Sequence, residues 1–237
     1  SRLLKAANRV GKEVASILDL DQLLPQTVNI ICEAYGLYYA GVFLLDEIGE
    51  YAVLRAGYGK AGKAMLAEGH KLRVGTDSMI GACVAMGEAR IALDVGEERV
   101  HFKNPHLPHT RSEMALPLVY GGRILGAVTI QSSEERAFGD DDITTLLTMA
   151  EHLAVAINNA KLIEELREAN NEILRNKVFE ALTTASTEAI HWIGNKTLPI
   201  SLTVSRLGEE IADGKVDLES LKEDLDMISE SAAQIIQ

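Results

Sequence analysis

The chain has 237 residues, of which 47% are hydrophobic and 24% are charged, and its formal net charge is −12. This length and composition allow one globular domain of ordinary size together with extended helices. An acidic chain without a clustered Lys/Arg face is not expected to bind nucleic acid, so that class of partner is excluded.

Cysteine content and hydropathy indicate the cellular compartment in which the protein is expected. Cys32 and Cys83 are the only cysteines, so we expect neither a disulfide framework nor a thiolate metal cage, and a reducing cytoplasm fits best. No apolar run approaches the ~20 residues that span a bilayer, and no signal peptide is visible, so no membrane partner is predicted. Because the chain begins and ends inside helical patterns, we expect a fragment of a longer protein.

The first part of the chain predicts helices followed by strands. Apolar spacing predicts an N-terminal helix over residues 1–19 and a second helix from Asp21 to near Gly36. Residues 39–45 and 51–56 have the composition of the two arms of a β-hairpin. The elements expected next are a short helix (60–68), a strand (70–74), a capped helix (78–86) and a strand (90–93).

An irregular loop containing Phe102 then leads to the clearest hairpin in the sequence. Its strands are predicted over residues 112–120 and 123–131, on either side of Gly121 and Gly122. Three aspartates, residues 140–142, are expected to cap a helix that runs from Ile143 through Ala160 and onward. This order of elements indicates an α+β domain.

Three stretches of this region resemble the GAF domain: Ser112-Glu113-Met114-Ala115-Leu116-Pro117-Leu118, then Gly121 to Ile130, then Phe138 with Asp140, Asp141 and Asp142. We place the GAF domain at residues 20–158. The resemblance implies a central antiparallel sheet, a helical layer on one face and a small-molecule pocket covered by loops on the other. The helix from Ser78 and the loop from Val100 to Arg111 are expected to cover that pocket, with candidate lining residues Met79, Cys83, His101 and Phe102.

The ligand of such a pocket stays open. Bilin-binding relatives bond their chromophore through a cysteine, whereas Cys32 and Cys83 both lie in apolar patterns typical of small core residues. The sequence also lacks the diagnostic motif of cyclic-nucleotide GAF domains and the clustered cysteines of GAF-fold free methionine sulfoxide reductases. The loop also contains His101, His106 and His109, which could ligate zinc or, singly, haem. A polar covering loop explains these histidines better, so no metal is assigned.

Residues 159–178 are predicted to form a coiled-coil linker. A heptad-like seam enters it through Val155, Leu162, Leu166, Ala169 and Ile173. A second track, one residue out of register, follows at Phe179, Leu182, Ser186, Ala189 and Ile193. The slip near Asn176 indicates either a packing accident or a bistable coil that passes a change in the GAF domain onward.

A histidine stands inside the helical pattern that follows. Glu188, His191, Asn195 and Pro199 are spaced three, four and four residues apart, which places them on one stripe of a helix. His191 is two residues from Ile193, so it is rotated by roughly 200° from the apolar seam and should face solvent. Such a stripe can carry phosphoryl chemistry, although a lone exposed histidine is usually only a polar surface residue.

The C-terminal region predicts a helical hairpin. One mostly apolar seam contains Ile193, Thr197, Ile200, Val204, Leu207 and Ile211. A turn signal at residues 212–215 is followed by a second seam at Leu218, Leu221, Leu225, Ile228, Ala232 and Ile235. Because two helices cannot enclose two such seams well, we expect a parallel homodimer through residues 153–237 that closes a four-helix bundle.

This hairpin, over residues 179–237, resembles the dimerisation and phosphotransfer hairpin of bacterial sensor histidine kinases. The resemblance rests on His191, on Asn195 one turn later and on Pro199 further along the same helix. It implies that His191 accepts a phosphoryl group. The family usually has an acidic residue directly after the histidine, where this chain has Trp192, so Glu188 is the expected substitute, with Asn195 assisting transfer or dephosphorylation.

Together these patterns predict the sensory and phosphotransfer portion of a cytoplasmic two-component sensor histidine kinase. Its partners would be a second copy, a response-regulator receiver domain and an ATP-binding domain that uses ATP and magnesium. No glycine-rich phosphate loop occurs in this sequence, so no cofactor is expected in this fragment and whether it is itself an enzyme is left open. The alternative is a non-catalytic GAF dimer that binds a ligand or serves as a scaffold.

Overall fold

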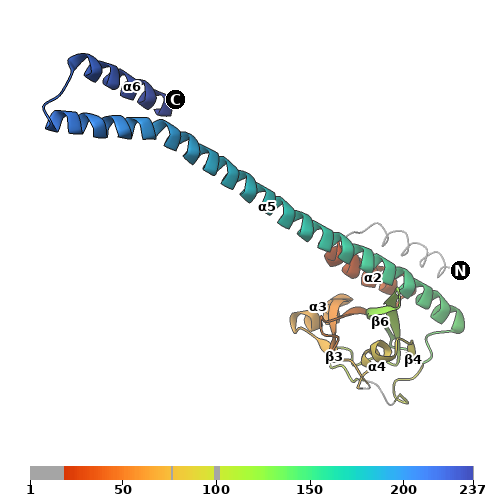
Figure 1. The fold of residues 1–237 in the computed structure, drawn as a ribbon. Helices are drawn as coiled ribbons and strands as arrows, with labels where there is room; N and C mark the ends of the chain where they lie inside the picture. Colours follow the sequence, from red (N-terminus) through yellow and green to blue (C-terminus); the bar gives the residue numbers. More distant parts are fainter. Residues whose placement is uncertain (1–18, 76, 99–101, 237) are drawn as a thin grey trace. The chain divides into compact units, whose positions relative to one another are not determined.

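The computed structural model describes residues 19–75, 77–98 and 102–236, in two compact units that meet at Arg167 and Glu168. The long helix α5 (Asp140–Ala212) supplies its first part to one unit and its remainder to the other (Figure 1). The N-terminal helix expected over residues 1–19 lies, except for its last residue, outside the described residues, as does His101. Among the described helices, none is both long and apolar enough to cross a membrane.

The first unit contains a six-stranded antiparallel sheet with the order β3-β2-β1-β6-β5-β4. Its strands are β1 (Tyr39–Leu45), β2 (Tyr51–Gly57), β3 (Lys71–Arg73), β4 (Arg90–Ala92), β5 (Ser112–Tyr120) and β6 (Arg123–Ser132). Gly121 and Gly122 both have positive φ angles, which the tight turn between β5 and β6 requires. The predicted antiparallel sheet is therefore confirmed.

Within the residues that the structure describes, four helices complete this unit: α2 (Leu20–Tyr35), α3 (Gly59–Ala67), α4 (Met79–Met86) and the first part of α5. Asp19 caps α2 through its side chain, and Gly36 ends that helix in the left-handed conformation. The Ser78 hydroxyl accepts a hydrogen bond from the Gly81 amide at the start of α4, as the sequence predicted. The helix expected from Ile143 begins earlier, at Asp140, because the aspartates form its first turn.

The sheet separates two apolar cores. On one face, α2 and α5 pack against alternate strand residues in a core that includes Ile31, Val42, Met114, Val128, Met149 and Leu153. On the other face, α3, α4 and the loop before β5 enclose a smaller core that includes Tyr39, Phe43, Met65, Met79, Cys83 and Leu107. Figure 1 shows α2 and α5 on one side of the strands and α3 and α4 on the other.

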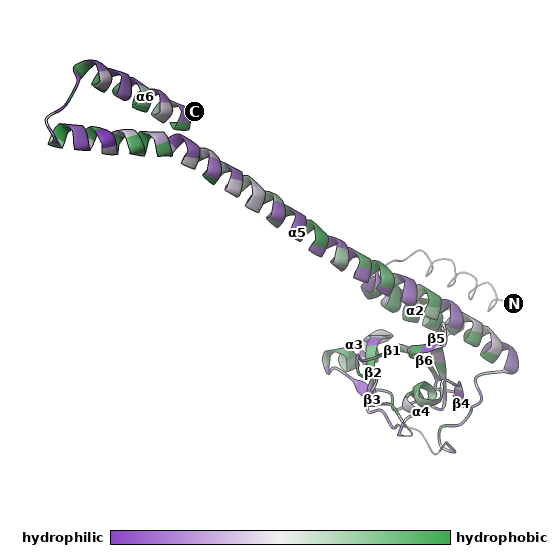
Figure 2. Cartoon of the chain, in the orientation of Figure 1, coloured by the Kyte–Doolittle hydropathy of each residue, from purple (hydrophilic) through white to green (hydrophobic). Residues whose placement is uncertain are grey.

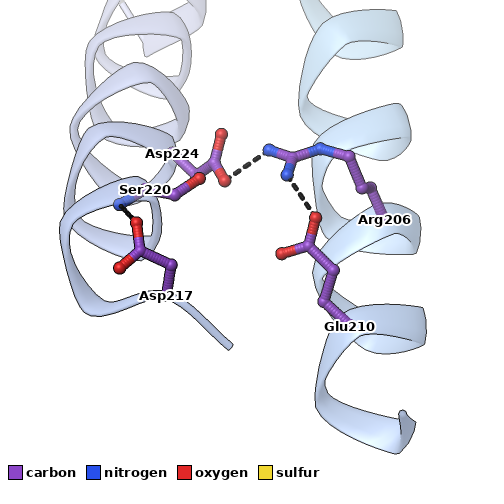
Figure 3. Close-up of polar contacts among 5 residues, drawn as sticks. All are labelled: Arg206, Glu210, Asp217, Ser220 and Asp224. Carbon is purple, nitrogen blue, oxygen red and sulfur yellow. Dashed lines mark hydrogen bonds and ion pairs between the residues drawn. The ribbon is translucent and has the colours of Figure 1, made fainter. Parts of the chain in front are cut away.

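The second unit is a helical hairpin made by the end of α5 and by α6 (Leu218–Ile236). Gly214 has a positive φ angle in the connecting turn, and the Asp217 carboxylate caps α6 by accepting a hydrogen bond from the Ser220 amide. Arg206 on α5 forms ion pairs with Glu210 on the same helix and with Asp224 on α6 (Figure 3). The Lys196 ammonium group donates to the Gln234 side chain at 2.7 Å.

The residues of the apolar seam predicted on α5 fall into two groups, one shielded by α6 and one exposed to solvent. Ile200 and Leu207 are shielded together with Thr203, whereas Ile193, Thr197, Val204 and Ile211 remain exposed. On α6 the positions Leu221, Ile228, Ala232 and Ile235 are half-buried, and Leu218 and Leu225 are exposed. Each helix therefore buries only part of its apolar surface inside its own hairpin. Figure 2 shows green apolar residues recurring along both helices.

Candidate functional site

Strand register creates a hollow on the face of the sheet that α3 and α4 cover. Residues that pair across neighbouring strands form rows that cross the sheet. One row runs across β1, β6, β5 and β4 and contains Tyr39, Gln131, Glu113 and Ala92 in that order. In the next row, Gly41, Thr129 and Ala115 are partners. Side chains of one row point to one face. The small residues of the second row leave room above the sheet, where a cavity of about 30 Å³ lies.

Three buried polar residues from β5 and β6 form the floor of this cavity. Thr129 donates its hydroxyl hydrogen to Glu113 Oε1 at 2.9 Å, and the Gln131 amide donates to the same oxygen at 3.1 Å. Thr110 in turn donates to the amide oxygen of Gln131 at 2.7 Å. Glu113 as a whole residue is only 6% exposed. This network holds a carboxylate in place on an otherwise apolar face.

Apolar and aromatic residues form the walls, including Phe43, Met65, Leu72, Met79, Phe102 and Leu107. The His70 ring lies between Phe43 and Phe102, with a centroid separation of 6.0 Å to each. Burial, helped by nearby His106, lowers the pKa of His70 below its ordinary value of 6.5. His70 is therefore neutral at physiological pH and can pack against both aromatic rings.

The loop over the cavity is tied down at three points. His106 Nε2 lies 2.9 Å from a carboxylate oxygen of Glu68, at the end of α3. The Asn104 amide contacts the sulfur of Met65, and Leu107 is buried beneath the loop. Thr110 adds its bond to the floor. Two loop histidines thus have structural contacts, His106 with Glu68 and His109 edge-on to Tyr38. Among the described residues no group of three His, Cys, Asp or Glu side chains is arranged to hold a metal ion.

The sequence-predicted pocket residues are only partly brought together. Met79 and Phe102 line the cavity, Cys83 is buried in the neighbouring core without lining it, and His101 lies outside the described residues. The polar floor was missed. A signal was present, because Glu113 interrupts an apolar strand and Thr129 and Gln131 alternate on its hairpin partner. The residues that pair were not predicted, because the register of β5 and β6 shifts by one residue between Leu118 and Val119.

The two cysteines are isolated from each other by the sheet. Cys32 belongs to the core under α2 and α5, and Cys83 belongs to the core on the cavity side. Burial raises the pKa of each thiol to about 12. Since the thiolate is the reactive form, neither residue is suited to nucleophilic or redox chemistry. Both behave as small core residues, as the apolar sequence around them predicted.

In the second unit, His191 is exposed on α5, with Glu188 and Asn195 exposed on the same stripe. The stripe lies far around the helix from Ile200, Thr203 and Leu207, which face α6. Pro199 lies inside α5 and cannot donate to the carbonyl of Asn195, so the helix lacks one hydrogen bond just after His191. Two exposed leucines, Leu198 and Leu202, continue the outer face beyond the histidine.

The described fold defines an α+β class of domain, with an antiparallel sheet, helices on both of its faces and a covered cavity. The sequence matches the GAF domain family over residues 17–158, which is more than half of the chain, and the chain therefore belongs to that family. The GAF part of the predicted fold is confirmed, and the protein contains a GAF sensory or regulatory module.

Solved structures share this fold at low sequence identity. The GAF domain of a phosphoenolpyruvate-protein phosphotransferase from Coxiella burnetii is 24% identical with a TM-score of 0.63, covering 69% of this chain and 97% of that one. A free methionine-R-sulfoxide reductase from Neisseria meningitidis, in complex with its substrate, is 21% identical with a TM-score of 0.59, covering 68% and 91%. A fragment of a methyl-accepting chemotaxis protein is 18% identical with a TM-score of 0.56, covering 65% and 98%. No curated protein matches the chain.

Proposed function

We propose that this chain is the sensory and phosphotransfer portion of a cytoplasmic sensor histidine kinase. In this proposal the GAF domain binds a small molecule, and its occupancy controls phosphorylation of His191 in a dimeric hairpin. The observation that carries the proposal is the stripe of Glu188, His191 and Asn195, which is exposed on the side of α5 away from α6. A phosphoryl donor and a phosphoryl acceptor both need that access.

The apolar surface of the hairpin supports the dimer. Ile193, Thr197, Val204 and Ile211 recur at helical spacing on α5 and stay exposed in a single chain. On a helical wheel this stripe lies roughly 70° from the residues that contact α6, and well away from His191. A second hairpin covering the stripe would complete a four-helix bundle while leaving the histidine open.

The chemistry proposed for His191 needs one unprotonated ring nitrogen as the nucleophile. That nitrogen attacks the γ-phosphorus of ATP, the bond to the β-phosphate oxygen breaks, and ADP leaves with its magnesium ion. Glu188, one turn earlier, is positioned to hold the N–H of the other ring nitrogen and to stabilise the positive charge that develops on the ring. Asn195, one turn later, would contact the phosphoryl group or orient a water molecule during dephosphorylation.

Two partners follow from this chemistry. The ATP-binding domain would supply the phosphoryl group, and a response-regulator receiver domain would accept it from His191. Leu198 and Leu202 are 60% and 62% exposed on the outer face next to the histidine. Exposed leucines beside a reactive residue favour a protein partner over a small acceptor. The receiver is therefore proposed to dock on this outer face.

The test is phosphoryl labelling of the chain joined to a histidine-kinase ATP-binding domain. His191→Gln is expected to abolish labelling, and Glu188→Gln to slow it by ~10²-fold, the usual scale for losing a general base. Asn195→Ala should chiefly change the rate of dephosphorylation. Lys196→Gln is a suitable control because it lies on the α6 side and should leave labelling unchanged. Labelling that persists in His191→Gln would overturn the proposal.

A second candidate function is a non-catalytic GAF dimer that binds a ligand and recruits partners. The observation that favours it is Trp192, which occupies the position directly after His191 and is partly exposed. The same labelling experiment separates the two functions. A dimer that binds partners through the hairpin without ever carrying phosphate at His191 would establish the scaffold.

A further inference from the structure

We infer that Asn159 sets the alignment of two copies of this chain, because its side-chain amide pairs with the same amide of a second copy along α5. This inference rests on the proposed dimer and adds to it the residue that selects a parallel pair of helices in register. Three features of α5 support it: an exposed apolar face, the position of Asn159 within that face, and the charges beside it.

Asn159 lies on an exposed apolar face of α5. Val155, Leu162 and Leu166 are 44%, 49% and 68% exposed, and Asn159 is exposed between them. Leu153, which packs into the core under the sheet, is rotated by roughly 120° around the helix from Asn159. The sheet therefore covers one side of α5, and the apolar face that contains Asn159 points elsewhere. Apolar residues that recur on one exposed face mark an interaction surface.

The spacing along this face is that of a two-stranded coiled coil. Successive residues of the face are separated by four and three positions in turn: Val155, Asn159, Leu162, Leu166, Ala169 and Ile173. In a heptad labelled a to g, Asn159 then occupies position a, and Leu166 occupies the same position one heptad later. Because a repeat of about 3.5 residues packs against another helix with the same repeat, the occupant that fits this face is a second copy of α5.

A buried asparagine at position a distinguishes between the possible alignments. In a parallel pair in register, equal positions form one layer, so the two Asn159 amides meet and each can donate a hydrogen bond to the other. In an antiparallel pair, positions a meet positions d, and Asn159 would lie against an apolar residue such as Val155 or Leu162. A parallel pair that slips by one heptad places Asn159 against Leu166. Both alternatives bury an amide without a partner, which costs free energy.

The charges beside the apolar face favour the same alignment. In a parallel pair, a residue at position g lies beside the residue at position e of the next heptad in the other chain, five positions further on. Glu172 and Lys177 have this relation, and both are exposed. An antiparallel pair would instead bring positions g together, where this segment has the like charges of Glu165 and Glu172. Charge complementarity therefore supports a second copy in the parallel orientation.

Disulfide cross-linking of the full chain tests the alignment. Leu166→Cys places a thiol at position a, where helices in register bring the two Cα atoms within the ~4.4–6.8 Å that a disulfide spans. Glu164→Cys is the matched control, because it lies on the same helix at position f, on the outer side of the pair. We expect mild oxidation to give covalent dimers of Leu166→Cys and not of Glu164→Cys. Cys32 and Cys83 are buried, and burial raises the pKa of each thiol to about 12, so neither should react.

The role of the amide is tested by Asn159→Leu. We expect the dissociation constant, measured by sedimentation velocity, to fall about tenfold or more, because two apolar side chains replace two amides in the interface. The share of mixed disulfides between Leu166→Cys and Ile173→Cys chains should rise, because these form when the pair slips by one heptad. Asn171→Leu is the control, because Asn171 is exposed at position f and its replacement should change neither quantity.

Three results would overturn the inference. These are cross-linking of Leu166→Cys no faster than that of Glu164→Cys, an unchanged dissociation constant in Asn159→Leu, or a share of mixed disulfides that is the same in Asn159→Leu and Asn171→Leu. Circular dichroism verifies that each variant keeps its helices, and the first comparison needs no change at Asn159. Labelling at His191 is measured separately, so a chain that is phosphorylated there while its helices slip freely would refute only the role of Asn159.

Discussion

The proposed dimer interface is tested most sharply by charge placed on the exposed stripe of α5. Val204 is 54% exposed in a single chain, and a partner hairpin would cover it. Full burial of a valine contributes about 1.5–3 kcal/mol, so covering the exposed half contributes about 1 kcal/mol per chain and about 2 kcal/mol per symmetric dimer. Losing that term alone raises the dissociation constant about 30-fold. Val204→Asp also buries two carboxylates, so we expect weakening of at least about 100-fold.

Leu202 provides a matched control for this substitution. It lies two residues away on the same helix and is 62% exposed, but it points roughly 200° around the helix from Val204. Leu202→Asp should therefore leave the dimer intact and instead impair transfer to a receiver domain. Sedimentation velocity over a range of concentrations measures both variants, and circular dichroism verifies that the helices persist. A monomeric wild-type chain at micromolar concentration, or equal weakening by both variants, would refute the interface.

Two further predictions concern the first unit. Gly62→Ala should lower the free energy of unfolding of this unit by about 1–3 kcal/mol or more, measured by urea denaturation. The reason is that the new Cβ would lie 2.1 Å from the carbonyl carbon and oxygen of Gly57. Gly139→Ala is the control, because its Cβ meets only an ordinary contact and the change should be nearly neutral. Folding lowers the pKa of His70, so the stability that its neutral ring contributes is complete above about pH 6.5 and is lost as the pH falls below that value. His70→Phe should flatten this dependence of the unfolding free energy on pH. An unchanged slope of unfolding free energy against pH would contradict the prediction.

The elements of the GAF domain were largely predictable from the sequence because local signals agreed with the tertiary structure. A continuous apolar run marked β1, the matching run after the turn marked β2, and Gly121 with Gly122 marked the turn between β5 and β6. The cap at Ser78 fixed the start of α4. In each case the same few residues determine both the local conformation and the way in which the element packs.

The cavity floor was harder to predict because it depends on register and on which face is covered. The sequence places Glu113, Thr129 and Gln131 on predicted strands. Their side chains form one hydrogen-bonded network only because Glu113 is paired with Gln131 across β5 and β6. The sequence also leaves open which neighbour covers each part of the apolar seam of α5. Apolar periodicity shows that Ile200 and Val204 avoid water, but it does not say which neighbour covers each one.

The arrangement of the sheet suggests how a ligand would act in the proposed sensor. Along β5, Glu113 faces the cavity while the adjacent Met114 lies in the core under α2 and α5. Along β6, Thr129 faces the cavity while Val128 and Ile130 lie in that same core. One layer of strands therefore separates the ligand from the first turns of α5.

Because interiors are close-packed, a shift of β5 or β6 on binding must be met by repacking against Met149 and Leu153 on that helix. A ligand changes the position of α5 only to the extent that it binds the two packings with different affinity. The polar floor is where such a difference would arise, since its hydrogen bonds connect the two strands that α5 covers.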